Sequence, residues 1–374
     1  MVEIIGVSVS HSKPYSSKPK IHGPTLRADL SERQAMVLRA LVAAYVGQAG
    51  PVASQTLSLL MPKPLSSASI RNTLSELHEA GLIDKAHASA GRVPTELGLR
   101  VFIDDLLELA DLGPHHQRLL DRALDGVDAA ETPRYASHLL SEYTRQLGFV
   151  VAPRVEQQRL RSLHLVPVST ERVLVVLITE NGGVIERIIE EAVPTPRRDL
   201  ERIGSLLAER VVGRTLVGLR EHLESEREHL RGEADEFMQR AWTLGLRACD
   251  TQGGEDLVIA TRLALLDQPE FSDPGRIRGL FAALETNQRL LDLLHQIAQA
   301  ENGETRVGLS MSLGTELGEP SLRDCVLMAV PYGLPAESGA HGVLGVIGPQ
   351  RMDYGRVIPL VSYCSELVTR KLLV

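Results

Sequence analysis

The sequence predicts an α+β protein of several domains, and three observations support this. The chain has 374 residues, enough for two or three domains, and its 43% hydrophobic and 24% charged residues are ordinary for a globular protein. Residues 28–110 show short helical patterns followed by two short strand patterns. Further strand patterns at 163–193 and after 307 are separated by a helical stretch, which predicts one α+β domain with an insertion.

The segment from Ser66 to Thr95 predicts a helix followed by a β-hairpin. Ser66 is a good N-cap, Gly81 supplies a left-handed stop, and the apolar residues between them recur at helical spacing. The other face carries short or hydrogen-bonding side chains near the helix N-terminus: Ser67, Ala68, Ser69, Arg71, Asn72 and Ser75. Arg and Asn pair bidentately with guanine and adenine, and short neighbours let the backbone approach DNA. An ordinary solvated helix surface explains the same residues.

The flanking residues favour the DNA-reading interpretation. Upstream, a first helix is expected from the stripe Leu38, Leu41, Val42 and Tyr45, and Gly50-Pro51 ends it. A second helix is expected around Ser54–Met61, with Leu57 and Leu60 on its apolar side. Three helices in this order are typical of a helix-turn-helix.

Downstream, Leu82-Ile83 and Arg92-Val93 are expected to pair around a tip at 85–91. A tip of this kind touches phosphate or a minor groove, and its candidate DNA contacts are Lys85, His87, Ser89 and Arg92.

Four runs of sequence resemble one known family. GPVASQTL at Gly50, SSASIRNTLSELHEAGLI at Ser66 and HASAGRVPTELGLRVFIDDLL at His87 are similar to the N-terminal domain of the HrcA heat-inducible transcription repressors. GVLGVIGPQRMDYGRVIPLVSY at Gly342 resembles that family's C-terminal signature. Two motifs in the right order at opposite ends argue against coincidence, and the resemblance runs from about residue 30 to the C-terminus.

The resemblance implies an architecture. Residues 28–110 would form a winged helix-turn-helix with its linker helix, residues 111–193 and 274–374 a GAF-like α/β domain, and residues 194–273 a helical dimerisation insertion. It also implies a homodimer that binds the inverted-repeat operator of class I heat-shock chaperone operons, releases it on heat shock, and depends on a GroE-type chaperonin. Two-fold protein symmetry requires a two-fold operator.

Local patterns give the remaining elements. A linker helix is expected at 94–112, further helix at 114–148, and strands at 163–168, 172–179 and 184–193 with an Asn-Gly-Gly turn. Helices follow at 196–212, 220–247 and 280–300. Short strands near 307, at 325–330 and at 343–347 precede a final helix from about Tyr354.

Charge argues mildly against nucleic-acid binding. The chain is formally −8, and residues 28–110 hold nine Asp or Glu against seven Lys or Arg. Lys63, Arg71, Lys85 and Arg92 nevertheless gather around the expected reading helix. Residues 1–27 form a basic, Ser- and Pro-rich extension that we expect to be disordered, either as a phosphate-seeking arm or without function.

The sequence lacks the common catalytic and metal-binding motifs, which predicts a protein that is not an enzyme and takes no cofactor or metal. The sequence lacks H-E-x-x-H, G-x-S-x-G and a Walker lysine, and the His115-His116 pair lacks a third ligand at metal spacing. Three scattered cysteines predict buried, reduced thiols. Asp353 is expected to cap the last helix, with Arg351 paired nearby. Without a membrane span or a signal-peptide core, a cytoplasmic location is expected.

Two other functions remain open on the sequence. A metabolite-responsive winged-helix regulator would bind a small ligand in its GAF-like domain, although 3% aromatic residues give little support for a stacking pocket. A signalling protein that does not bind DNA would use the winged helix as a protein contact.

Overall fold

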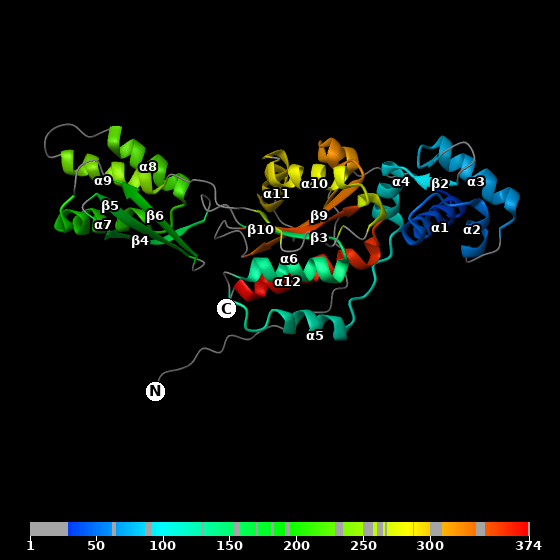
Figure 1. Ribbon diagram of the computed structural model, residues 1–374, viewed down its shortest axis with the longest axis horizontal. Coiled ribbons are helices and arrows are strands. Elements are labelled where there is room, and N and C mark those ends of the chain that lie inside the picture. Colours follow the sequence, from blue (N-terminus) through cyan, green and yellow to red (C-terminus); the bar gives the residue numbers. More distant parts are fainter. Residues whose placement is uncertain are drawn as a thin grey trace.

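The computed structural model describes residues 29–61, 65–86, 91–128, 131–152, 158–169, 171–180, 183–190, 195–228, 235–249, 257–259, 265, 268–286, 288–299, 309–333 and 341–372. The expected N-terminal extension at 1–27 lies outside these ranges, as do Lys63, His87 and Ser89. Three groups of elements follow one another along the long axis of the molecule (Figure 1). We call them the N-terminal unit (29–113), the central unit (114–152 and 257–372) and the inserted unit (158–249).

The N-terminal unit is built from helices that begin at hydrogen-bonding caps. The side chains of Ser31, Ser66 and Thr95 each accept a backbone N–H of the following turn, which satisfies donors that the helix leaves free. Its elements are α1 (Glu32–Gln48), α2 (Ser54–Leu60), α3 (Ser67–Glu79), β1 (Ile83–Lys85), β2 (Arg92–Pro94), α4 (Glu96–Val101) and a π-helical turn (Phe102–Leu106).

Two expectations for this unit need correction. The linker helix starts at Glu96 and ends at Leu106, not at residue 112, because Pro94 belongs to β2 and residues 107–113 are irregular. Leu60 was expected on the apolar side of its helix but is 50% exposed, and only Leu57 of α2 is buried.

The central unit is a five-stranded antiparallel sheet with helices on both faces. Strand order is β7-β3-β10-β9-β8. α6 and α12 cover one face and α10 and α11 the other, as Figure 1 shows. The strands are β3 (Leu147–Val151), β7 (Leu257–Val258), β8 (Ser310–Leu313), β9 (Cys325–Gly333) and β10 (His341–Pro349). The helices are α5 (Pro114–Ala123), α6 (Thr132–Thr144), α10 (Pro274–Thr286), α11 (Gln288–Gln299) and α12 (Tyr354–Leu372), with 3-10 turns at Pro269–Phe271, Gly314–Leu317 and Pro320–Leu322.

Alternation along the strands divides the core of this unit into two layers. Val326 and Met328 of β9 face the α6–α12 side, while Leu327 and Ala329 face the α10–α11 side. The first layer is continuous with the apolar core of the N-terminal unit. Successive side chains of a strand point to opposite faces, so a fully buried strand packs into both layers.

Three sequence expectations fall in the central unit. The final helix begins at Tyr354, as predicted. The stretch 114–148, expected to be helical throughout, ends in β3, whose five residues are all buried and apolar or glycine. The helix expected at 280–300 is two helices, α10 and α11.

The inserted unit has its own sheet and its own core. β4 (Leu160–Pro167), β5 (Arg172–Thr179) and β6 (Val184–Glu190) form an antiparallel meander. α7 (Arg197–Val211), α8 (Leu216–Glu228) and α9 (Asp235–Ala248) pack with it around Trp242. The helical pattern at 220–247 thus divides between two helices.

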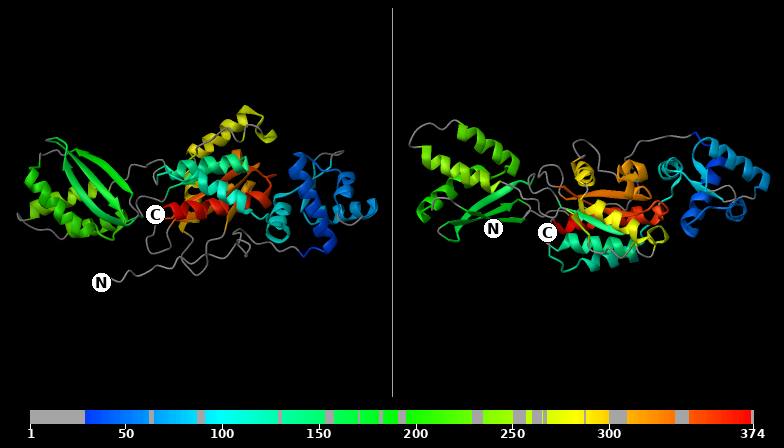
Figure 2. Two further views of the ribbon diagram at one scale, coloured as in Figure 1. Left: turned by 90° about the horizontal axis from the view of Figure 1, so that it is seen from below. Right: turned by 45° about the horizontal axis from the view of Figure 1, so that its top comes forward.

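The meander was expected in the GAF-like domain, with the insertion starting at 194. In the structure it packs with α7–α9 instead, since Val175 and Leu177 of β5 share one core with Leu200 and Leu207 of α7. β3 and β7, which flank the unit in sequence, pair with each other in the central sheet. Figure 2 shows the inserted unit to one side of the central sheet in two further views.

Candidate nucleic-acid interface

α3 has one buried and one exposed face. Its N-terminus is fixed by the Ser66 hydroxyl, which accepts the Ser69 N–H at 3.1 Å, and Gly81 follows with φ +73°. The buried side consists of Ile70, Thr73, Leu74 and Leu77. Both the cap and the left-handed glycine agree with the expectation, because the local sequence dictates them.

The exposed face of α3 is the one on which the sequence placed its candidate contacts. Ser67, Ala68, Arg71, Asn72 and Ser75 are exposed, and Ser69 is half-buried. The Ser75 hydroxyl donates to the Arg71 carbonyl at 3.1 Å and is thereby occupied within the helix. Among these candidate contacts, Arg71 and Asn72 therefore offer the longest hydrogen-bonding side chains.

The hairpin lies beside α3 as part of a small sheet. β1 and β2 pair antiparallel with Lys85 opposite Arg92. Val52 and Arg92 exchange two backbone hydrogen bonds of 2.8 Å, so the segment before α2 extends the hairpin on its second edge. Gly91 makes this possible, since a Cβ there would lie 2.3 Å from the Val52 carbonyl oxygen.

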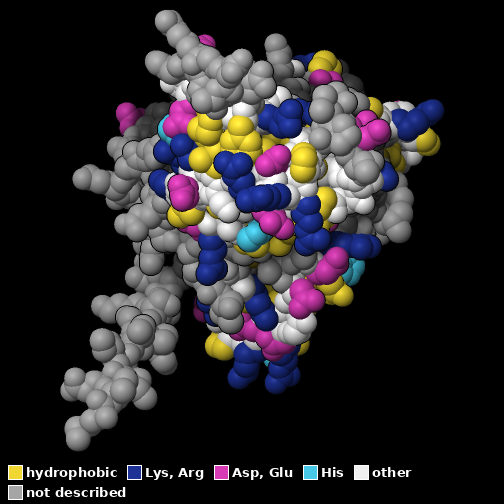
Figure 3. Space-filling model, turned by 90° about the vertical axis from the view of Figure 1, so that its left-hand side faces the viewer, with side chains coloured by type: hydrophobic (Ala, Val, Ile, Leu, Met, Phe, Trp, Pro, Cys, Tyr) yellow, Lys and Arg dark blue, Asp and Glu magenta, His cyan; other side chains and the backbone are white. Residues whose placement is uncertain are grey.

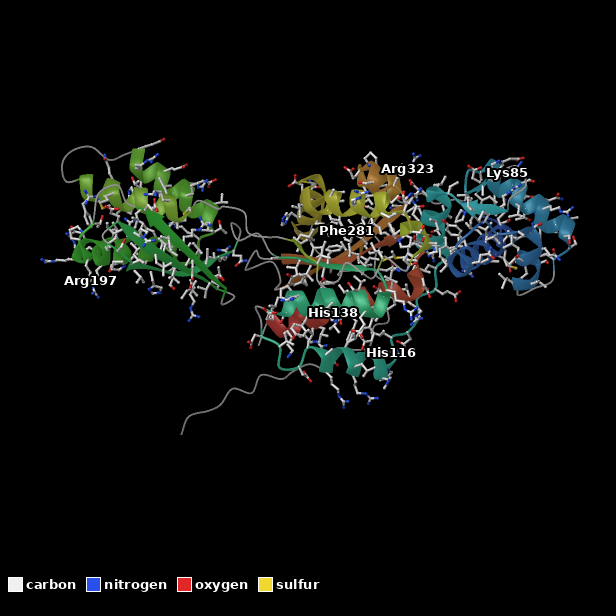
Figure 4. All side chains as sticks on the ribbon, in the orientation of Figure 1. Lys85, His116, His138, Arg197, Phe281 and Arg323 are labelled. Atoms are coloured by element: carbon white, nitrogen blue, oxygen red, sulfur yellow. The ribbon has the colours of Figure 1, made fainter. Side chains whose placement is uncertain are left out.

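The two basic residues of the hairpin differ in access. Lys85 is exposed and points away from the body of the N-terminal unit in Figure 4. Arg92 is half-buried, and its Nε is buried without a hydrogen-bond partner in the described part of the chain. Of the two, Lys85 is thus the better placed to meet a phosphate.

A brace between α1 and α3 was not expected from the sequence. Glu76 of α3 accepts Arg33 at 3.1 Å and Gln34 Nε2 at 3.1 Å, both on the first turn of α1. His78 Nδ1 lies 2.9 Å from the Ile83 carbonyl oxygen and ties the end of α3 to β1. These contacts hold the exposed face of α3 in a fixed relation to the rest of the unit.

Other candidate residues have structural roles. Asp353 accepts the Arg356 N–H at 3.4 Å at the start of α12, and Arg351 pairs with Glu270 and Gln268, as expected. His115 and His116 are both exposed on α5. Within the described ranges, no group of three or more His, Cys, Asp or Glu residues is arranged to hold a metal ion.

All three cysteines are buried and form no disulfide, as expected. Burial raises the pKa of the Cys325 and Cys364 thiols to about 12, with neighbouring carboxylates adding to the effect at Cys325. Among the residues that the structure describes, no helix is both long and apolar enough to cross a bilayer.

Comparison with known proteins gives consistent results over most of the chain. Residues 131–358 match the model of the HrcA protein C-terminal domain. The heat-inducible transcription repressor HrcA of Sorangium cellulosum is 36% identical over 349 residues, covering 91% of this chain and 97% of its own length. The protein of the same name from Chromobacterium violaceum is 35% identical, covering 92% and 98%.

One solved structure supports the fold. A crystal structure of a hypothetical protein at 2.2 Å resolution superposes with a TM-score of 0.55 at 23% identity, covering 92% of this chain and 97% of that one. The family model spans more than half of the sequence, and the two HrcA proteins are 36% and 35% identical over most of the chain, which establishes the family. The chain belongs to the HrcA family of heat-inducible transcription repressors.

Proposed function

We propose that the chain is a dimeric transcriptional repressor whose N-terminal unit is a winged helix-turn-helix. The observation that carries this is the pair of faces of α3, one buried on Ile70, Leu74 and Leu77, the other exposing Arg71 and Asn72 beside the hairpin. An exposed, capped helix beside a basic hairpin suits the major groove, with base edges read by α3 and phosphates bound by Lys85. His87 and Ser89 belong to the same proposal, although they lie outside the described residues.

The N-terminal unit holds few basic side chains, so firm binding requires two copies. Few phosphate contacts give weak non-specific affinity, so a single module would bind a half-site poorly. Joining two modules in a homodimer raises affinity for an inverted repeat by roughly 10² to 10⁴ without new contacts.

The inserted unit offers a face for this homodimer. Its helices cover one side of the meander, while the other side exposes apolar side chains in register. Leu174 of β5 lies between Val166 and Ile188, and Ile178 lies beside Val184. Ile188 is 59% and Val184 58% exposed. These two groups of apolar side chains lie on the same face, on either side of His164, Val176 and Glu186, and they favour a protein contact.

Charged and hydrophobic side chains are mixed on the surface at this end of the molecule. Figure 3, which looks onto the end formed by the inserted unit, shows hydrophobic side chains beside Lys, Arg, Asp and Glu. A mixed surface of this kind suits the polar rim of an interface. The proposal therefore assigns dimerisation to residues 158–249 rather than 194–273.

The regulated genes and the regulator follow from the family resemblance. The repressor would act in the cytoplasm on the inverted repeat ahead of class I heat-shock chaperone operons and release it on heating. A GroE-type chaperonin would return inactive molecules to the DNA-competent state. The central unit, which the resemblance makes GAF-like, would connect the DNA-binding and dimerising parts.

Selection from a random duplex library tests the proposal. The full-length wild-type protein should enrich one half-site motif, present twice as an inverted repeat. A mobility-shift assay should then separate that duplex from a base-shuffled one at physiological salt. Recovery of no motif, or equal binding to both duplexes, would remove sequence-specific DNA binding from the account.

A further inference from the structure

Two side chains of α4 fasten the N-terminal unit to the central unit. Arg100 Nη2 donates to the Met311 carbonyl of β8 at 3.0 Å and to Glu316 Oε2 at 2.5 Å. Glu96, one turn earlier, accepts Thr315 Oγ1 at 2.6 Å and Gln350 Nε2 at 3.3 Å. We call these residues the α4 clamp: Glu96, Arg100, Met311, Thr315, Glu316 and Gln350.

The clamp is tightly fitted. Gly314 has φ +42°, and a Cβ there would lie 1.9 Å from Glu96 Oε1 and 2.6 Å from Gln350 Nε2. A side chain at this position would be strained by the backbone conformation and would displace Glu96 or Gln350. The backbone before Thr315 is thus shaped to receive Glu96, which argues for a specified contact rather than an incidental one.

The clamp favours one orientation more than it favours stability. Arg100 is 2% exposed, and its Nε and Nη1 are buried with no hydrogen-bond partner among the described residues. Desolvating a guanidinium without satisfying all its donors offsets most of the attraction to Glu316. Removing the Glu316 carboxylate, by contrast, leaves the Arg100 guanidinium buried and without its counter-ion, so the pair opposes displacement of α4.

Orientation at this point matters because of the shape of the molecule. Lys85 of the N-terminal unit and Arg197 of the inserted unit lie at opposite ends of the long axis (Figure 4). The polypeptide that leaves the N-terminal unit at 107–113 is irregular. If the dimer contact lies on the inserted unit, the relative position of the two α3 helices therefore depends on the junction between the N-terminal unit and the central unit.

We infer that Arg100 and Glu96 are positioning residues that fix the orientation of the N-terminal unit and so set the half-site spacing that the dimer accepts. The inference rests on the proposed function. In this inference the residues of the α4 clamp do not contact DNA themselves. Loosening the clamp should leave recognition of one half-site intact while removing the preference for one spacing.

The experiment uses full-length protein and duplexes built on the inverted repeat that the wild type selects in vitro. One duplex has the selected spacing, one has two added central base pairs, and one has a single half-site. Two base pairs rotate one half-site by about 70° and move it by about 7 Å. The variants are Arg100→Met, which breaks the buried pair, and Glu96→Ala with Thr315→Val, which removes the more exposed part of the clamp. Arg197→Met, which breaks an exposed ion pair with Glu201 on α7 of the inserted unit, is the control.

For wild type and Arg197→Met, the two added base pairs should weaken binding at least about 30-fold, toward the affinity of the single half-site, because avidity is lost. For both clamp variants the same insertion should cost less than about 3-fold, with single-half-site affinity within about 2-fold of wild type. Circular dichroism and sedimentation establish whether each variant is folded and dimeric. If Arg100→Met does not fold, the variant Glu96→Ala with Thr315→Val tests the inference by itself. A folded clamp variant that keeps the wild-type spacing ratio overturns the inference. A wild type that selects no repeat overturns the proposed function instead.

Discussion

At the scale of single residues, Arg71 and Asn72 carry the base-reading part of the proposal. Both are exposed on α3, and neither is needed for its buried face. Replacing either by Ala should cost about 1–3 kcal/mol of binding to the selected repeat, with little change on shuffled DNA. Fluorescence anisotropy on both duplexes measures this, with Arg197→Ala on α7 of the inserted unit as a control. Equal losses on the two duplexes would make the residue a phosphate anchor.

Two glycines test the packing of the N-terminal unit. A Cβ on Gly98 of α4 would lie 1.9 Å from the Leu82 carbonyl oxygen, whereas a Cβ on Gly47 of α1 meets nothing within 4 Å. Gly98→Ala should therefore lower the free energy of unfolding by about 1–3 kcal/mol through overpacking. Gly47→Ala should raise it by about 0.5 kcal/mol through helix propensity. Urea denaturation measures the free energy of unfolding of both variants. Equal changes in the two would contradict the close packing of α4 on Leu82.

The buried thiols give a pH dependence. The pKa of Cys325 and Cys364 rises from the ordinary 9.0 to about 12, so below pH 9 both thiols are neutral in the folded and unfolded states and contribute no slope. Above pH 9 only the unfolded state loses these protons, so stability should fall between pH 9 and about 12. Cys325→Ala with Cys364→Ala should reduce that slope in denaturation curves. Rapid labelling of native wild-type cysteines by a thiol reagent at pH 8 would contradict their burial.

At the scale of elements, the hairpin should act mainly through charge. Lys85→Met should weaken binding to specific and shuffled duplexes alike and lower the slope of log K against log salt by about 1 for each phosphate interaction that the substitution removes. Arg92→Met should change the slope less, since Arg92 is half-buried. Binding titrations over a range of salt concentrations measure both slopes. An unchanged slope for Lys85→Met would place the hairpin off the DNA.

The open side of the meander is the element to which dimerisation is assigned. Ile188→Glu places a charge among the exposed apolar side chains and, by two-fold symmetry, does so twice per dimer. The dissociation constant of the dimer should rise at least about 30-fold, since burying an Ile side chain is worth about 1.5–3 kcal/mol. Val212→Glu, at a 64% exposed position after α7, should have little effect. Sedimentation equilibrium compares the two, and a dimer unaffected by Ile188→Glu would move the contact elsewhere.

Local signals predicted elements well and their partners poorly. The cap at Ser66 and the i, i+4, i+7 spacing of Ile70, Leu74 and Leu77 were enough to place α3, because caps and periodicity act within a few residues. β3 was missed since five buried residues after a helix carry no alternation to mark them as a strand. The strands of the meander were predicted correctly. Their separation from the central sheet was not predicted, because contacts between residues far apart in the sequence decide which strands share a sheet.

The same limit applies to the functional surfaces. The exposed residues of α3 were predicted because they complete an amphipathic helix. The brace from Arg33 to Glu76 joins residues 43 positions apart, and the pair of Arg100 with Glu316 spans 216 positions. Neither has a local signature. Only the fold shows that the buried Arg100 connects the N-terminal unit to the central unit.

For the whole molecule, the family resemblance predicts control by a chaperonin. If the repressor inactivates readily and is returned by the chaperonin, the repressed fraction follows the supply of free chaperonin, for which unfolded clients compete. Operator occupancy at fixed temperature should rise when chaperonin and ATP are added and fall again when an unfolded client follows. Occupancy that ignores all three additions, yet is lost on warming the repressor alone, would favour sensing by the repressor itself.

The central claim is that two copies of the N-terminal unit read the two arms of one inverted repeat. Hydroxyl-radical footprinting of full-length protein on the selected duplex tests it most directly, with the mass of the complex measured in parallel. The account predicts two protected patches related by the dyad of the repeat and one dimer per duplex, with protection of both patches lost together in Ile188→Glu at concentrations that saturate the wild type. A single protected patch bound by a monomer at full affinity, or uniform protection along the duplex, would contradict it.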